Sequence, residues 1–184
     1  MNLPNKLTML RIVAVPVFVV LMTAGPSFRI WAFVIFALAS LTDMLDGRIA
    51  RARNLVTDFG KIMDPLADKI LVLAAMVCFC ELGEVPGWTL IIVLFREFLI
   101  SGMRIVAAAN GNVIAAGISG KIKTVLQMVS LVLLLLAGIP AGFLASPAFR
   151  TAALVLYYAS VAMCALSGAE YVVKNKEVFL SKGI

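Results

Sequence analysis

The chain has 184 residues, of which 62% are hydrophobic and only 14% are charged. A soluble domain is about half apolar and about a quarter charged, so this composition excludes an ordinary soluble fold and indicates a polytopic membrane protein. The formal net charge of +6 comes without a soluble basic face carrying interleaved aromatic residues, so nucleic acid is not an expected partner.

Six long apolar stretches follow one another along the chain, and crossing the hydrocarbon layer takes about 20 residues. We expect an all-α fold with about six transmembrane helices in a bundle, because these stretches are too long and too uniformly apolar for barrel strands. The expected spans are residues 8–25, 30–47, 62–82, 88–108, 122–142 and 150–173. No room is left for a separate soluble domain, so residues 1–184 are expected to form a single membrane domain.

The first apolar stretch follows a short basic start and could instead be a signal peptide. No convincing small-residue cleavage site follows it, and its length suits a first span. The three cysteines lie inside apolar stretches and are expected to act as small hydrophobic residues. Tryptophan and tyrosine residues are expected to be interfacial anchors or packing residues.

Basic residues are unevenly distributed between the two sides of the expected bundle. All but three of the 16 lysine and arginine residues lie in or beside one set of connections. Arg29 and Arg150 fall on the other side, and Arg96 lies within a span. The positive-inside rule then places both termini in the cytoplasm, and the basic side is suited to anionic membrane lipids.

Four aspartates stand out in this apolar chain, two where the second span ends and two where the third begins. Asp43 and Asp46 are three residues apart, and Asp64 and Asp68 are four apart, so each pair shares one face of a helix. Hard divalent cations prefer such oxygen ligands, and four close carboxylates cannot all stay ionised without cations. The pattern predicts a pair of Mg²⁺ (or Mn²⁺) ions at a polar cavity on the cytoplasmic side.

Such a metal pair would attract a diphosphate, neutralise its charge and orient the reacting phosphorus. Asp68 is the last of the set and, if it is less committed to metal, could take a proton from an attacking hydroxyl. The alternative is that each aspartate is a helix-end carboxylate paired with a basic neighbour. Those neighbours are Arg48, Arg51, Arg53, Lys61 and Lys69.

The aspartate segment resembles the signature of the CDP-alcohol phosphotransferases, membrane enzymes that make phospholipids: D-x2-D-G-x2-A-R-x8-G-x3-D-x3-D. All fixed positions are matched, by Asp43, Asp46, Gly47, Ala50, Arg51, Gly60, Asp64 and Asp68. The resemblance implies that the first three aspartates hold the metal pair and that Asp68 is shared between metal and general base. It also implies that the CDP-activated lipid is bound by Asp46, Gly47, Ala50, Arg51 and Gly60, with Gly47 beside the cytidine and Arg51 at the nucleotide end.

Further blocks resemble one branch of this family, and they lie at Asn2–Arg11, Asp64–Lys69, Arg96–Arg104 and Gly120–Thr124. That branch transfers a phosphatidyl group from CDP-diacylglycerol to glycerol 3-phosphate and releases CMP. The resemblance therefore implies these substrates and this product. It also implies a location in a bacterial inner membrane, with the active site cytoplasmic, and a homodimer.

Glycerol 3-phosphate is a dianion, so its pocket needs cationic donors. The candidates are Arg96, Arg104, Lys121 and Lys123, because an arginine fork suits phosphate oxygens and lysine adds a point charge. For Arg96 the alternative is an ion pair with Glu97 or with another helix. For the other three it is ordinary positive-inside anchoring.

Asn5, Thr8 and Arg11 are three residues apart and share one face at the start of the first span. They are expected either to contact the phosphates of CDP-diacylglycerol or to form a capping and headgroup-anchoring stripe. Two other functions remain open for the whole chain. One is the same chemistry with another acceptor, inositol phosphate or serine, and the other is divalent-cation transport, which usually uses sites near the bilayer midplane.

Overall fold

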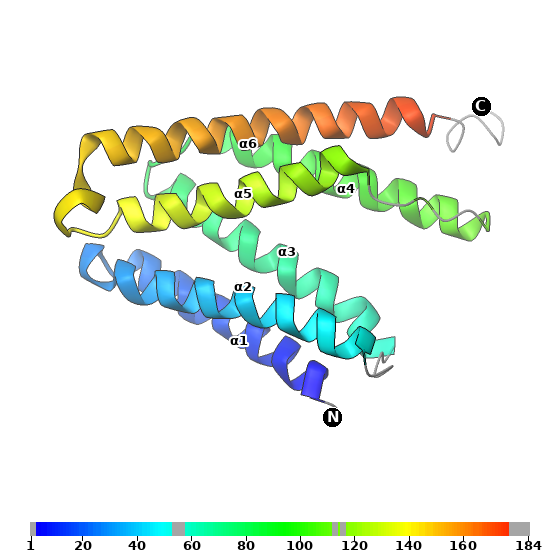
Figure 1. The fold of residues 1–184 in the computed structure, drawn as a ribbon, viewed down its shortest axis with the longest axis horizontal. Coiled ribbons are helices and arrows are strands. Elements are labelled where there is room, and N and C mark those ends of the chain that lie inside the picture. The colour runs from blue at the N-terminus through cyan, green and yellow to red at the C-terminus, as the bar shows by residue number, and fades with distance from the viewer. Residues whose placement is uncertain (1–2, 53–57, 112–113, 115–116, 177–184) are drawn as a thin grey trace. The chain divides into compact units, whose positions relative to one another are not determined.

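A computed structural model describes the backbone of residues 3–52, 58–111, 114 and 117–176, and the side chains of residues 7–42, 63, 66–67, 69–111, 114 and 117–176. Over these residues the chain is helical throughout and contains no strand. The α-helices are α1 (Leu3–Thr23), α2 (Arg29–Ala52), α3 (Asp58–Glu81), α4 (Gly87–Ala109), α5 (Ile118–Ala137) and α6 (Pro147–Lys174). Two short 3-10 helices, η1 (Pro26–Phe28) and η2 (Gly142–Ala145), lie between them (Figure 1).

The predicted all-α fold is confirmed, and each expected span coincides with one α-helix. Several helix ends differ from the expectation; α1, for example, begins at Leu3 rather than at residue 8, and α5 begins at Ile118 rather than at residue 122. Helix α2 continues past residue 47 to Ala52, because alanine and arginine at its end are good helix formers even where the chain is polar. Helix α3 begins at Asp58, four residues before the expected start. Helix α5 ends at Ala137 rather than at residue 142, because Gly138 and Pro140 interrupt the helix.

Among the described residues, α5 and α6 are long and apolar enough to cross a membrane. Shorter apolar helical stretches occupy Leu7–Thr23 and Pro26–Thr42 among the described residues. Helix α4 has a comparable length but carries Arg96, Glu97 and Arg104. Membrane association therefore rests on α5 and α6, and a complete six-span bundle stays a prediction.

The chain divides into two compact units. The first comprises Met1–Val85 with Leu131–Arg150, and the second comprises Pro86–Ser130 with Thr151–Ile184. In the first unit, α1 packs against both α2 and α3, as Figure 1 shows for α1 and α2 at the start of the colour range. The rings of Phe18 and Phe36 meet in this core with their centroids 5.8 Å apart.

The second unit has a polar interior. Helix α6 buries Tyr157, Ser160, Cys164, Ser167 and Tyr171, which are three or four residues apart and so share one face. The Tyr157 hydroxyl lies 2.7 Å from the Thr89 hydroxyl of α4, and the Ser130 hydroxyl of α5 lies 3.5 Å from that of Ser160. Small and hydroxyl-bearing residues at helix contacts are typical of helices packed in lipid.

The outward face of α4 is apolar. Ile91, Phe95, Phe98 and Ile105 are between 66% and 71% exposed and recur at helical spacing, so they form one stripe. A helix that is surrounded by lipid is expected to carry large apolar groups outside and polar groups inside.

The free cysteines fit the expected packing role, since Cys78 and Cys164 are buried and Cys80 is half-buried.

A buried ion pair ties three segments of the first unit together. The Arg29 guanidinium, at the start of α2, donates through Nη2 to Glu84 Oε1 and lies 5.4 Å from the centre of the Phe79 ring. Gly138, just after α5, packs against this guanidinium. The charges of Arg29 and Glu84 therefore neutralise one another where α3 and α5 end.

We predict that Gly138→Ala destabilises the protein by about 1–3 kcal/mol, the usual cost of overpacking. A Cβ at residue 138 would lie only 2.6 Å from Cζ of Arg29, so the ion pair must shift. Gly102→Ala is the matched control, because a Cβ there meets nothing within 4 Å and alanine favours the helix. Thermal unfolding in detergent, followed by far-UV circular dichroism, checks this, and equal melting temperatures for the two variants would contradict it.

Candidate functional site

The aspartate motif lies on the facing ends of two neighbouring helices of the first unit. Helix α2 carries Asp43, Asp46, Gly47, Ala50 and Arg51, and α3 carries Gly60, Asp64 and Asp68. Both segments are helical, so the spacings of three and four place each aspartate pair on one face of its helix. Helices α2 and α3 contact one another.

The side chains of the whole motif fall outside the described residues, so their convergence stays a prediction. The same holds for Asn5. Among the side chains that are described, no group of three histidine, cysteine, aspartate or glutamate residues could hold a metal ion. The predicted metal site therefore stays assigned to Asp43, Asp46, Asp64 and Asp68, whose side chains lie outside the described residues.

Thr8 and Arg11 of α1 are buried, with exposures of 1% and 2%. The Nε atom of Arg11 donates to the backbone oxygen of Ala39 at 3.3 Å. Ala39 lies on α2 one helical turn before Asp43, so Arg11 links α1 to the helix that carries the first aspartate pair. Burial of both side chains argues against a stripe that only faces lipid headgroups.

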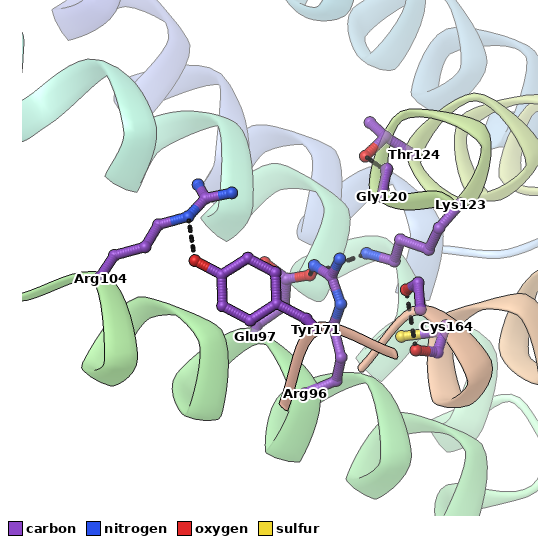
Figure 2. A network of polar contacts seen from close by, with 9 residues as sticks. Arg96, Glu97, Arg104, Gly120, Lys123, Thr124, Cys164 and Tyr171 are labelled. Carbon is purple, nitrogen blue, oxygen red and sulfur yellow. Dashed lines mark hydrogen bonds and ion pairs between the residues drawn. The ribbon is translucent and has the colours of Figure 1, made fainter. Parts of the chain in front are cut away.

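In the second unit, one carboxylate joins two of the predicted acceptor-site residues. Glu97 Oε1 accepts a hydrogen bond from Arg96 Nη1 at 2.7 Å and another from Lys123 Nζ at 2.9 Å. Figure 2 shows Lys123 reaching from α5 to meet Arg96 and Glu97 of α4. The side chains of Arg96, Glu97 and Lys123 are 13%, 19% and 6% exposed.

The alternative of an Arg96–Glu97 ion pair is therefore realised, together with an interhelical pair to Lys123. Two cations share a single carboxylate, so the three side chains, which we call the Glu97 cluster, keep one positive charge in excess. A charge in a low-dielectric interior is costly unless it is paired. The two ion pairs thus leave one positive charge that an anionic ligand could neutralise.

Two glycines border the Arg96 side chain. A Cβ at Gly120 of α5 would lie 3.3 Å from Arg96 Nη2, and a Cβ at Gly168 of α6 would lie 3.0 Å from its Cγ. The Nε atom of Arg96 is buried and has no hydrogen-bond partner within the described part of the chain. Both helices therefore approach Arg96 through positions that carry no side chain.

Arg104 lies further along α4 and contacts an aromatic residue of α6. Its Nε donates to the Tyr171 hydroxyl at 3.3 Å, and its guanidinium carbon lies 5.6 Å from the centre of the same ring (Figure 2). Arg104 is exposed, whereas Tyr171 is buried and packs with Ile100 and Met103. Lys121 is exposed at the start of α5.

Of the predicted acceptor residues, the structure thus joins Arg96 and Lys123 directly and gives Arg104 a separate partner. Sequence reasoning missed the contribution of Tyr171, which was expected only as an anchor or packing residue. Its place on the buried face of α6, four residues beyond Ser167 and three beyond Gly168, was the one available signal. The pairing of Tyr171 with Arg104 leaves no trace in the sequence.

Comparison with known proteins identifies the family. The sequence model for CDP-alcohol phosphatidyltransferase matches residues 1–169. The chain therefore belongs to the CDP-alcohol phosphatidyltransferase family, and the expected class is confirmed.

Three relatives within this family are similar to the chain over most of its length. The chain is 40% identical over 189 residues to the CDP-diacylglycerol–glycerol-3-phosphate 3-phosphatidyltransferase of Bacillus subtilis (strain 168), with 96% of each chain covered. It is 42% identical over 136 residues to the protein of the same name from Rickettsia bellii (strain RML369-C), covering 73% of this chain and 75% of the relative. It is 36% identical over 177 residues to a probable phosphatidylglycerophosphate synthase of Mycobacterium tuberculosis (strain ATCC 25618 / H37Rv), covering 94% and 81%.

We predict that Tyr171→Phe lowers the stability of the protein by about 1 kcal/mol, the typical worth of one hydrogen bond. The ring stays in its packed position, and only the hydroxyl that accepts from Arg104 is lost. Tyr158→Phe is the control, because Tyr158 is 40% exposed and its stacking on Trp88 survives the change. Far-UV circular dichroism melts of both variants check this, and an unchanged melting temperature for Tyr171→Phe would count against the hydrogen bond.

Proposed function

We propose that the protein transfers the phosphatidyl group of CDP-diacylglycerol to glycerol 3-phosphate, giving phosphatidylglycerophosphate and CMP. The observation that carries this proposal is the complete aspartate signature on two neighbouring helices of a chain that belongs to the family. The two relatives that are named for this reaction favour glycerol 3-phosphate as the acceptor.

The donor set fits a pair of divalent ions. Asp43, Asp46, Asp64 and Asp68 supply four carboxylates from the contacting helices α2 and α3, and Mg²⁺ and Mn²⁺ both prefer carboxylate oxygens. Once bound, such ions would neutralise the diphosphate of CDP-diacylglycerol and stabilise its entering and leaving oxygens.

One of the aspartates would also act as the general base for the acceptor hydroxyl. Asp68 lies one helical turn beyond Asp64, at the end of the motif, and would take the proton of the acceptor hydroxyl. The resulting oxygen forms a bond to the lipid-side phosphorus, while the bond from that phosphorus to the bridging oxygen of the diphosphate breaks. CMP departs with that oxygen and its electron pair.

The nucleotide-activated lipid would be bound by residues of the first unit. These are Asn5, Thr8, Arg11, Asp46, Gly47, Ala50, Arg51 and Gly60. Support comes from Arg11, which is buried and bonded to α2 one turn before Asp43. The absent side chains of Gly47 and Gly60 allow close approach to the backbone.

The acceptor phosphate would be bound by Arg96, Arg104, Lys121 and Lys123 of the second unit. The surplus positive charge of the Glu97 cluster supports this, because a phosphate monoester brings a net negative charge, whereas serine is a zwitterion with no net charge. Glycerol 3-phosphate and inositol phosphate both satisfy this criterion, whereas serine does not.

We further propose a multi-pass protein of the bacterial inner membrane, with both termini and the aspartate motif on the cytoplasmic side. Support comes from the length and apolarity of α5 and α6 and from the uneven distribution of basic residues. The homodimer implied by the family resemblance belongs to the same proposal.

We predict that the purified protein in detergent–lipid micelles releases CMP from CDP-diacylglycerol only when glycerol 3-phosphate is present. Asp68→Asn should lower turnover by about 10²–10⁴-fold, the usual contribution of a general base. Asp58→Asn is the matched control, because Asp58 begins α3 but lies outside the signature.

Each result of this assay decides a separate point. A fully active Asp68→Asn variant would remove the general-base role while sparing the transfer reaction. Incorporation of labelled serine in place of glycerol 3-phosphate would overturn the proposed acceptor.

We also predict that a chelator abolishes CMP release and that added Mg²⁺ or Mn²⁺ restores it, because the diphosphate charge is then neutralised again. Asp43→Asn should need a higher metal concentration for half-maximal activity. Metal flux in proteoliposomes, measured alongside CMP release, tests the transporter alternative, and flux without CMP release would contradict our proposal.

A further inference from the structure

We propose that Glu97 is a positioning residue for the acceptor phosphate: it fixes Arg96 and Lys123 so that one edge of the Arg96 guanidinium is presented to that phosphate. This inference rests on the proposed function, since it concerns how the acceptor is held. It assigns the role to a carboxylate that does not itself contact the phosphate.

The first argument is the hydrogen bonding at Glu97. A single oxygen, Oε1, accepts from both Arg96 Nη1 and Lys123 Nζ. These donors come from different helices, α4 and α5, so the carboxylate sets the position of each cation relative to the other. Without it the two adjacent cations would repel one another and separate, because their charges are poorly screened in a buried site.

The second argument concerns the edge of the Arg96 guanidinium that Glu97 does not bind. The Nη1 atom is taken by Glu97, whereas Nε and Nη2 form the other edge of the planar guanidinium, which suits two phosphate oxygens. The Nε atom is buried without a hydrogen-bond partner among the described residues. A buried donor left unpaired costs about 1–3 kcal/mol, and a phosphate oxygen would remove that cost.

The third argument is the space beside this edge. The glycine at residue 120 keeps a Cβ away from Nη2, and the glycine at residue 168 keeps one away from Cγ of Arg96. The backbones of α5 and α6 thus pass close to this side chain, at Nη2 and at Cγ, and a side chain at either glycine would crowd it. Glu97 holds the far end, so the orientation of the guanidinium is determined from three sides.

The ion pair between Arg29 and Glu84 shows what a purely structural pair looks like in this chain. It joins one cation to one anion and leaves no surplus charge. Arg29 Nε, like Arg96 Nε, is buried without a hydrogen-bond partner among the described residues, so the surplus charge is what distinguishes the Glu97 cluster. The Glu97 cluster joins two cations to one anion. The two glutamates have the same side-chain exposure, 19%, which makes Glu84→Gln a matched control for Glu97→Gln.

The test measures KM for each substrate and kcat with the full-length enzyme in detergent–lipid micelles. Glu97→Gln should raise KM for glycerol 3-phosphate about tenfold or more, with KM for CDP-diacylglycerol changed less than about twofold; tenfold corresponds to about 1.4 kcal/mol. Glu84→Gln should leave both KM values unchanged. A general electrostatic effect predicts the opposite sign, because removing an anion near a phosphate site should lower KM.

A second variant covers the case in which Glu97→Gln does not fold. Glu97→Asp keeps the charge but withdraws the carboxylate by one methylene, so it cannot reach both cations, and KM for glycerol 3-phosphate should still rise by several-fold. An unchanged or lowered KM for glycerol 3-phosphate in a folded Glu97 variant would overturn the inference. Failure of the wild-type enzyme to release CMP with glycerol 3-phosphate would instead overturn the proposed function.

Discussion

A charge buried among apolar helices must be matched by an opposite charge or by a ligand, and this constraint decides where the polar residues of the chain can lie. Arg29 and Glu84 satisfy it as a neutral pair. The Glu97 cluster satisfies it only in part, since one carboxylate faces two cations. The aspartate motif places four carboxylates on the helices α2 and α3, and their predicted convergence would be balanced by divalent cations.

A carboxylate cluster and a surplus of positive charge suit the two kinds of partner that a phosphatidyl transfer requires. Converging carboxylates would bind divalent cations and, through them, a diphosphate. Surplus positive charge attracts the phosphate of an acceptor. Our proposal therefore attributes specificity for a phosphorylated acceptor to the local charge: Glu97 would neutralise one of the two cations, and the acceptor phosphate would neutralise the other.

Much of the fold was predictable from the sequence, because uninterrupted apolar length determines where helices form in a membrane protein. The aspartate signature was equally recognisable from the sequence, since all its residues lie within one short segment. The cluster around Glu97 was not, because Lys123 meets Glu97 only through the register of α5 against α4. The same applies to Tyr171 and Arg104, and to the glycines at 120 and 168, whose significance depends on which side chain lies opposite them. Helix ends were the least predictable feature, as α2 and α5 illustrate.

The distribution of the cysteines has a practical consequence. Cys78 is buried in the first unit and Cys164 in the second, so each unit conceals a thiol that becomes accessible only when that unit opens. With the half-buried Cys80 replaced by serine, maleimide labelling of Cys78 and Cys164 would record the opening of each unit separately within one molecule. The two buried thiols therefore allow an experiment that asks whether the two units unfold together or one after the other.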